Sequence, residues 1–354
     1  MDENGNRLQD DQLTLFVSVV MPVRNESAFI EKCLKSICSN SYPREAMEIL
    51  VLDGMSDDGT RRVVKSLAES DSRIRLFDNP QRTVSYALNL GIKAARGQII
   101  IRIDGHAAVP ENFIAESVRS LCNHPEAWCA GGIIEIVNES PVGKAIAGAL
   151  TSPVGVGNAR FRLGSFQGYA DTVAWGAYWR WVFDKIGFFD VELIRNQDDE
   201  LNHRLVQAGG KIWISSSIRS KYFPRMTFRN LGRQYFQYGF WRIRSIQKRG
   251  RPATLRQITP LVFISIWILL IAGGFFWSSI WNILISFAAI YGILLAWGAV
   301  DVHRRIGFRA AGLAPLVFMI LHFCYGLGSL WGLFWFGALR RKSIENPEEY
   351  AMSR

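Results

Sequence analysis

The chain has 354 residues, which is enough for one large α/β domain and an additional region. Its 41 lysine and arginine residues outnumber its 31 acidic residues, so the formal net charge is +10. Five cysteines without Cys-x-x-Cys spacing argue against a disulfide framework or a zinc site. The amino terminus is polar and lacks the apolar core of a secretory signal, and we expect residues 1–13 to be disordered.

Apolar runs and amphipathic segments alternate along the first part of the chain. We expect strands at 15–21, 47–52, 74–77 and 98–103, and helices after a cap at Ser27, around Val63 and at 83–95. Pro22 is expected to end the first strand. Repeated strand–helix alternation indicates βαβ units. The sequence therefore predicts an α/β fold with a mostly parallel, Rossmann-like sheet.

Weaker signals continue through the middle of the chain. The expected elements are a helix at 110–121, a strand at 128–137 that contains Gly132, a mobile connection at 139–165, a strand at 169–178, a helix at 179–186, a helix opened by Asn196 and a short strand at 212–215. These elements complete one domain, which we place at residues 14–225.

In the stretch 98–106, a run rich in isoleucine is followed abruptly by Asp104, Gly105 and His106. Ligands of open α/β sheets bind at the carboxyl ends of the strands, so a site is expected here. The strand before Asp53 ends in the same way, and parallel strands would bring both aspartates to one edge of the sheet. The alternative is a turn-capping aspartate followed by a surface histidine.

Basic and aromatic residues alternate between 227 and 248, and apolar stretches follow at about 260–277, 280–300 and 313–337. We predict an amphipathic helix at a membrane interface, with its basic side toward the headgroups, so a membrane rather than nucleic acid is the expected partner. Each apolar stretch has about 18 or more residues, enough to cross a hydrocarbon core of about 30 Å. The predicted regions are an interface helix at 226–256, membrane segments at 257–338 and a tail at 339–354.

Arginines predict the orientation of these segments. Basic residues before the first apolar stretch, and Arg304, Arg305 and Arg309 between the second and third, are expected on the cytoplasmic side. The basic run at 340–342 would then lie outside if all three stretches crossed. Either the tail departs from the rule or the third stretch is re-entrant, and the sequence leaves both alternatives open. His322, within that stretch, is expected to be packed or hydrogen-bonded.

Several motifs together resemble family-2 glycosyltransferases, which are inverting enzymes with a nucleotide-sugar-binding GT-A fold. The motifs are Val19–Glu26, Asp53–Thr60, Asp104–His106 and Gln197–Asp198. The stretches at 102–107 and 237–242 are similar to those of bacterial exopolysaccharide glycosyltransferases of the succinoglycan type. The resemblance covers about residues 15–250.

The resemblance implies a UDP-sugar donor and assigns roles at its site. Asp53 would bind the uracil end, Asp58 would help to hold the nucleotide, and Asp104 would reach the ribose and a divalent cation. The rest of the predicted donor site consists of Pro22, Asn25, Glu26 and Arg82.

The predicted metal ligands are Asp104 and His106. His106 stands where the family usually has the second carboxylate of an Asp-x-Asp motif. Imidazole is a softer ligand that suits Mn²⁺ better than Mg²⁺, and both ions stay open as the cofactor. A divalent cation would neutralise the charge that develops on the leaving diphosphate.

The acceptor hydroxyl needs a general base, and Asp198 is the predicted one, with Asp199 as the fallback. Asp198 could instead only offset the dipole of its helix. Gly132, Gln237 and Trp241 are predicted to lie near the acceptor. Packing is the alternative for the last two, because Phe240 replaces the arginine of the related Gln-x-x-Arg-Trp motif.

The sequence thus predicts a multi-pass enzyme of the bacterial inner membrane with a cytoplasmic catalytic domain. It would transfer a hexose, with glucose expected, from a UDP-sugar to a polyprenyl-diphosphate-linked saccharide in exopolysaccharide synthesis. The alternatives are a polyprenyl-phosphate sugar synthase, a processive polysaccharide synthase and a non-catalytic membrane sensor of sugar nucleotides.

Overall fold

The computed structural model describes residues 15–157, 166–223, 227–252 and 254–339. The predicted amino-terminal disorder and the basic run at 340–342 lie outside these residues. The chain forms two compact units, and each is considered by itself. The first unit contains Met1–Ile133, Phe166–Phe189 and Leu201–Lys221, and the second contains Ile134–Ser165, Asp190–Glu200 and Tyr222–Arg354.

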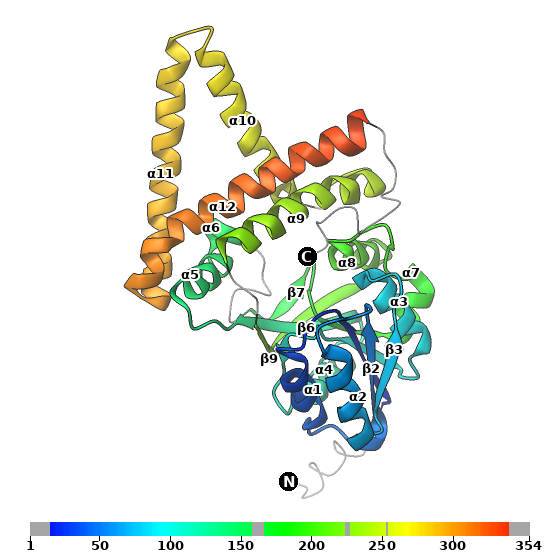
Figure 1. Cartoon of the computed structure of the whole chain (residues 1–354). Helices are drawn as coiled ribbons and strands as arrows, with labels where there is room; N and C mark the ends of the chain where they lie inside the picture. The colour runs from blue at the N-terminus through cyan, green and yellow to red at the C-terminus, as the bar shows by residue number, and fades with distance from the viewer. Residues whose placement is uncertain (1–14, 158–165, 224–226, 253, 340–354) are drawn as a thin grey trace, which may run out of the picture. The chain divides into compact units, whose positions relative to one another are not determined.

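A mixed sheet forms the centre of the first unit (Figure 1). Its strands are β1 (Val17–Val23), β2 (Met47–Asp53), β3 (Ile74–Asp78), β4 (Ile99–Arg102), β5 (Ala107–Ala108), β6 (Ala127–Ile136), β7 (Gly168–Ala170), β8 (Gly176–Trp179) and β9 (Lys211–Tyr222). Within the described part of the chain their order is β3-β2-β1-β4-β8-β6-β9-β5, with β7 paired to β9. Strands β1 to β4 pair in parallel, whereas β8 is antiparallel to both β4 and β6. The predicted α/β fold class is confirmed.

Helices cover this sheet and follow the predicted alternation. They are α1 (Ile30–Cys38), α2 (Thr60–Ser70), α3 (Val84–Ala94), α4 (Phe113–Asn123) and α7 (Arg180–Ile186), together with α8 (Gln197–Gln207) from Leu201 onward; the first turn of α8 belongs to the second unit. Every residue of β1, β2 and β4 is buried, as expected for parallel strands covered on both faces. Helix α3 packs on β1 and β2. The continuous apolar runs therefore form the core of the unit.

The strand order decides where the predicted acidic residues lie. Strand β1 runs between β2 and β4, with Val23 opposite Asp53 and Val20 opposite Arg102. Asp53 and Asp104 therefore follow the carboxyl ends of parallel strands at the same edge of the sheet. The two aspartates share that edge, but one strand separates them.

Several local predictions need correction. Ser27 does not cap α1, which starts after Phe29 without a side-chain cap, and Pro22 lies inside β1 near its end. A proline is tolerated there because a strand end need not supply a ladder N–H. The expected strand at 169–178 is split into β7 and β8, and β9 is much longer than expected.

The segment 139–165 is not simply a mobile connection, because its described part contains α5 (Pro141–Leu150) and α6 (Pro153–Val156). The Ser140 hydroxyl caps α5 by accepting the Gly143 N–H at 2.9 Å. Small residues pack this helix closely: Ala145 and Ala149 are completely buried. Glycine and alanine gave a weak sequence pattern although they pack well.

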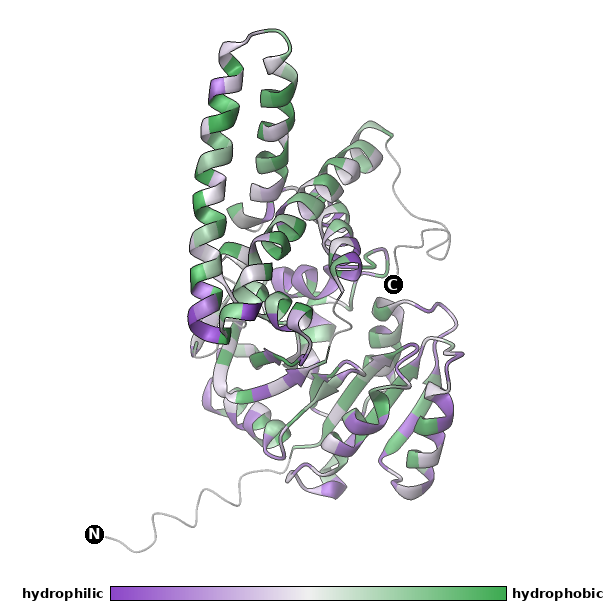
Figure 2. Cartoon of the chain, turned by 60° about the vertical axis from the view of Figure 1, so that its left-hand side comes forward, coloured by the Kyte–Doolittle hydropathy of each residue, from purple (hydrophilic) through white to green (hydrophobic). Residues whose placement is uncertain are grey.

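Long helices dominate the second unit. They are α9 (Phe228–Arg249), α10 (Thr259–Gly274), α11 (Ser279–Ile306) and α12 (Phe308–Gly332), which continues as a π-helical turn at Leu333–Ala338. Helices α10 and α11 form a hairpin (Figure 1). Apolar residues surround most of this hairpin, and hydrophilic ones gather at the carboxyl end of α11 (Figure 2).

Two described helices, Ser279–Ile306 and Phe308–Ala338, are long and apolar enough to cross a membrane. Helix α10 has 16 residues and is shorter than the apolar stretch predicted there. Only 17% of the most apolar window of α11 is buried, so α11 is not the core helix of a soluble protein. This exposed apolar surface suggests association with a membrane.

Helices α9 and α12 lie against each other and run in the same direction. Gly232 of α9 lies near Cys324 of α12, and further along both helices Gly239 lies near Ser329. A Cβ atom on Gly328 would stand 2.0 Å from the backbone oxygen of Phe236. Glycines at these positions let the two backbones approach closely.

The substitution Gly328→Ala is expected to destabilise this helix pair, because a Cβ atom would overlap backbone that cannot rotate away. Overpacking of this kind costs about 1–3 kcal/mol. Gly312→Ala in the same helix is the matched control, since a Cβ there meets nothing within 4 Å. Thermal unfolding of both variants in detergent is the measurement, and equal midpoints would contradict the close helix contact.

Candidate active site

The loops that follow β1 and β2 are joined by hydrogen bonds in the first unit. The backbone N–H of Asn25 donates to Ser56 Oγ at 2.8 Å, and the Asn25 side chain accepts the Asp57 N–H at 3.1 Å. The Glu26 N–H donates to Thr60 Oγ1 at 2.8 Å. These bonds fix two predicted donor-site residues, Asn25 and Glu26, against the loop that contains Asp58.

Asp53 is completely buried at the end of β2. Its carboxylate lies 2.7 Å from Arg61 Nη1 and accepts the Ser56 hydroxyl at 2.5 Å. Arg61 also contacts Asp78 at the end of β3, at 2.7 Å. Sequence reasoning missed Arg61, although its position in the first turn of the helix after the Asp53 loop could have indicated it.

Asp58 precedes α2 and accepts hydrogen bonds from two loops. Its Oδ1 atom accepts the N–H of Thr60 at 3.0 Å, and its Oδ2 atom accepts the Ser27 N–H at 3.0 Å. Partial burial raises the pKa of Asp58, but these bonds outweigh it and lower the pKa to about 2. Asp58 is therefore ionised at neutral pH, and it connects the first residue of α2 to Ser27 in the loop after β1.

Left-handed backbone marks the ends of the first three strands. Asn25 follows β1 with φ of 55°, Met55 follows β2 with 57°, and Arg82 follows β3 with 56°. Few residues other than glycine adopt these angles, and such strain concentrates at ligand sites. The predicted donor-site residues Asn25 and Arg82 are thus among the strained residues.

Asp104 and His106 follow β4, as predicted. Arg102 Nε donates to Asp104 Oδ1 at 3.0 Å, and His106 Nδ1 lies 3.0 Å from Glu26 Oε1. Burial raises the pKa of Asp104, but the Arg102 guanidinium and His106 outweigh this and hold it below its ordinary value. The loop after β1 and the loop after β4 therefore meet at this histidine.

The donor set of Asp104 and His106 fits a divalent cation that also binds substrate phosphate. No cluster of three or more His, Cys, Asp or Glu side chains that could hold a metal ion occurs among the described residues. Protein sites with one or two ligands are common when phosphate oxygens complete the coordination. The carboxylate of Glu26 beside His106 Nδ1 matches the outer partner that usually orients a metal-binding histidine.

Gly132 lies on β6, where β9 approaches closely. A Cβ atom at this position would stand 1.8 Å from the backbone oxygen of Ile218. The glycine is therefore required by strand packing in the first unit.

Asp198 belongs to the second unit, in the first turn of α8. Its Oδ1 atom accepts the Asp199 N–H at 2.9 Å. Asp199 forms an ion pair with the buried Arg242 of α9. A carboxylate paired in this way is a poor base, so the geometry favours Asp198 over the fallback Asp199.

Gln237 and Trp241 are 1% and 3% exposed and lie within the second unit. Gln237 Oε1 accepts a hydrogen bond from Arg195 Nε at 3.1 Å. Trp241 packs on Phe336, with the ring centroids 5.9 Å apart. These contacts give both residues a role in packing, which was the alternative considered for them.

Two basic residues on the carboxyl-terminal half of α9 form ion pairs within the second unit. Arg244 lies 3.0 Å from Glu192, and Lys248 forms ion pairs with Glu192 and Asp190. Asp190 and Glu192, in the segment before α8, therefore offset the charges of Arg244 and Lys248.

His322 is hydrogen-bonded, as expected. Its Nδ1 atom lies 3.0 Å from the Tyr291 hydroxyl, and its Nε2 atom lies 2.8 Å from the Val154 carbonyl oxygen. Asn89 of α3 bonds the Phe189 backbone with both ends of its amide.

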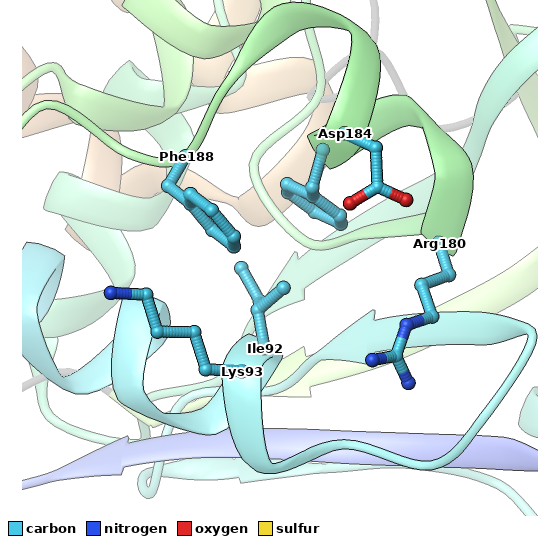
Figure 3. Close-up of a pocket in the computed structure, with 6 residues that line it drawn as sticks. Ile92, Lys93, Arg180, Asp184 and Phe188 are labelled. Carbon is cyan, nitrogen blue, oxygen red and sulfur yellow. The ribbon is translucent and has the colours of Figure 1, made fainter.

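A hollow of about 200 Å³ lies between the ends of α3 and α7 (Figure 3). Its lining consists of Ile92, Lys93, Arg180, Phe183, Asp184 and Phe188. Lys93 is in the last turn of α3, which leads to the amino end of β4, whereas the predicted site residues follow carboxyl ends. The hollow contains none of the predicted site residues.

Comparison with known proteins decides the family. The profile of Glycosyl transferase family 2 matches residues 18–162. Dolichyl N-acetyl-alpha-D-glucosaminyl phosphate 3-beta-D-2,3-diacetamido-2,3-dideoxy-beta-D-glucuronosyltransferase of Methanococcus voltae is 31% identical over 231 residues, which span 63% of this chain and 72% of that protein. The chain belongs to glycosyltransferase family 2. As such it is a glycosyltransferase, as the motifs predicted.

This family-2 glycosyltransferase is also similar to the succinoglycan biosynthesis protein ExoA of Rhizobium meliloti, with 29% identity over 331 residues, 91% of this chain and 96% of that protein. Its fold resembles that of the mannosyltransferase PcManGT from Pyrobaculum calidifontis in complex with GDP-Man and Mn²⁺, with a TM-score of 0.58 and 19% identity. That match covers 90% of this chain and 88% of the other. The likeness confirms the predicted GT-A fold.

Proposed function

We propose that this glycosyltransferase transfers a hexose, with glucose as the expected sugar, from a UDP-sugar to a polyprenyl-diphosphate-linked saccharide, with inversion. The arrangement that carries the proposal is the edge of the sheet in the first unit, where Asp53, Asp58 and Asp104 follow strands or precede a helix beside strained loops. The similarity to a succinoglycan biosynthesis protein supports a role in exopolysaccharide synthesis.

The donor would bind where the loops after β1 to β4 converge. Asp53, fixed by Arg61 and Ser56, would present its carboxylate to the uracil. Asp58 binds the backbone of Ser27 and Thr60. Its proposed role is to hold the loop after β2 in place for the nucleotide. The donor side therefore depends on groups that are already oriented by neighbouring residues.

Asp104 and His106 would hold a divalent cation, and Glu26 would orient His106 through its Nδ1 atom. A bound cation neutralises negative charge on the departing diphosphate. The imidazole favours Mn²⁺. The Mn²⁺ in the structurally similar PcManGT is consistent with this ligand set.

Asp198 would act as the general base that removes the proton from the acceptor hydroxyl. It is the carboxylate of the Gln197–Asp198 motif, and the ion pair with Arg242 argues against its neighbour Asp199 as the base. A base positioned at the reacting hydroxyl contributes about 10²–10⁴-fold to the rate. The relative from Methanococcus voltae is named for transfer to a dolichyl phosphate-linked sugar. This name supports an acceptor of the lipid-linked saccharide class.

The hairpin of α10 and α11 would insert into the cytoplasmic membrane of a bacterium. Uncharged residues form its tip, including Phe275, Phe276 and Trp277, which are all well exposed. Arg304 and Arg305 at the other end of α11 would remain on the cytoplasmic side. Because α12 packs along α9 through glycines, we propose that α12 stays with α9 at the interface and does not cross independently.

One alternative remains attractive chemically: a polyprenyl-phosphate sugar synthase, whose acceptor is already an anion and needs no base. Asp198→Asn separates the two functions. For a saccharide acceptor, the variant is expected to retain UDP affinity while transfer from radiolabelled UDP-glucose into the lipid fraction falls about 10²–10⁴-fold. Undiminished transfer would favour the synthase, and parallel loss of UDP binding would make Asp198 a folding residue.

Metal dependence gives a second test that needs no acceptor. Asp104→Ala is expected to weaken UDP binding in the presence of Mn²⁺ by more than the roughly 10- to 100-fold that the loss of an outer-shell partner costs. Calorimetric titration with UDP, with Mn²⁺ and with EDTA, is the measurement. In EDTA the variant should lose only the affinity that the ribose contact of Asp104 contributes, so its loss there is expected to be smaller than its loss in Mn²⁺. Equal binding in Mn²⁺ would mean that the cation is held elsewhere.

The topology is tested by a reporter fused after Arg354. If only the α10–α11 hairpin enters the membrane, the fusion is expected to be active as a cytoplasmic reporter and inactive as a periplasmic one. A fusion at Ser278, in the tip of the hairpin, is the control and should give the opposite result if both hairpin helices cross. Periplasmic activity after Arg354 would instead support three crossings.

A further inference from the structure

One carboxylate in the first turn of α8 is contacted by three donor groups. Asp199 Oδ2 forms an ion pair with Arg242, accepts a hydrogen bond from Gln257 Nε2 at 3.2 Å and lies 3.8 Å from Arg249 Nη1. All of these residues belong to the second unit. Asp199 is therefore held by α9 and by the turn that precedes α10.

These charges are removed from water. The side chains of Arg242, Arg249 and Asp199 are 11%, 4% and 17% exposed. Burying ions costs several kcal/mol for each ion, and only good geometry and further hydrogen bonds compensate for it. A buried network is therefore weak evidence for stability alone, and its position next to Asp198 suggests another role.

Arg242 uses its remaining donors to bind Asn196, two residues before Asp198, and Tyr325 of α12. Its Nη2 atom donates to Asn196 Oδ1 at 3.2 Å, and its Nε atom donates to the Tyr325 hydroxyl at 3.1 Å. Burial lowers the pKa of Arg242, but Asp199 and Tyr325 outweigh it and raise the pKa, so the guanidinium stays charged. One side chain thus connects the segment before α8, the first turn of α8, and α12.

Asn196 is itself in an unusual conformation. Its φ is 62°, in the left-handed region, and its Nδ2 atom donates to the Tyr238 carbonyl oxygen at 3.1 Å. A residue keeps this angle only where its surroundings impose it. Asn196 and Asp199 enclose Gln197 and Asp198, so Arg242 fixes the backbone before and after the proposed base.

We propose that Arg242 is a positioning residue for glycosyl transfer, which fixes the carboxylate of Asp198 by binding Asn196 and Asp199 at the same time. The proposal rests on the proposed function, because Asp198 is the base only in that function. Arg242 need not touch either substrate for this role. It acts through the backbone of the first turn of α8.

The test compares Arg242→Gln with wild type in the full chain in membranes, with UDP-glucose as donor and extracted lipid-linked saccharides as acceptor. A displacement of about 1 Å can cost about 10²-fold in rate, so kcat is expected to fall by about that factor. The KM for UDP-glucose should change less than about twofold. Arg229→Gln, an exposed residue of the same helix, is the matched control and should leave both constants unchanged.

Two further variants distinguish positioning from stability. Arg242→Lys keeps the charge but lacks the planar fork that serves three acceptors, so it should recover only part of kcat. The double variant Arg242→Gln with Asp199→Asn removes the whole Arg242–Asp199 ion pair and leaves Arg249 as the remaining charge of the network. Its kcat is expected to stay low, because Asn196 and Asp198 are still not fixed.

Three results would overturn the proposal. A kcat for Arg242→Gln within twofold of wild type would do so, and so would full recovery of kcat in the double variant, which would indicate a purely structural pair. Asp198→Asn with wild-type transfer would remove the base assignment and the positioning role together. Loss of transfer in Asp198→Asn with normal transfer in Arg242→Gln would leave the proposed function intact and reject the positioning role alone.

Discussion

The pairing of a fully buried carboxylate with an arginine underlies the proposed donor side of this enzyme. Asp53 has no exposed surface, and an unpaired carboxylate in that position would cost several kcal/mol. Arg61 satisfies it and also reaches Asp78, while Ser56 connects Asp53 to Asn25. The carboxyl ends of β1, β2 and β3 are therefore linked by polar side chains, and a nucleotide would meet loops that are already ordered.

The second unit uses the same physical device around α8. Arg242 satisfies Asp199, and its other donors reach Asn196 and Tyr325. In each unit a charged pair restrains the backbone next to a residue with proposed chemistry. Such pairs favour a rigid structure over easy folding. Removal of one partner leaves a buried charge without its counter-ion. Rigid positioning of reacting groups is valuable for group transfer, because a small displacement costs much of the rate.

Much of the first unit could be predicted from the sequence, because long apolar runs ended by acidic residues indicate buried parallel strands. Asp53 and Asp104 reach one edge for this reason. The glycine- and alanine-rich α5 was missed since small residues give little periodicity. A motif predicted that Trp241 and Gln237 lie near substrate; both side chains are buried, and the prediction stays open. Arg242 was not predicted from the sequence, because its partners Asn196 and Asp199 are more than 40 residues away along the chain.

The parallel pairing of α9 and α12 limits which changes of length the connection between them can accept. Two helices that point the same way must be joined by a segment that travels out and returns, and the α10–α11 hairpin does this. The register of α9 and α12 is fixed by their glycines and not by the length of the hairpin. Equal numbers of residues could therefore be added to or removed from both arms, which would match bilayers of different thickness while the helices beside the proposed base kept their alignment.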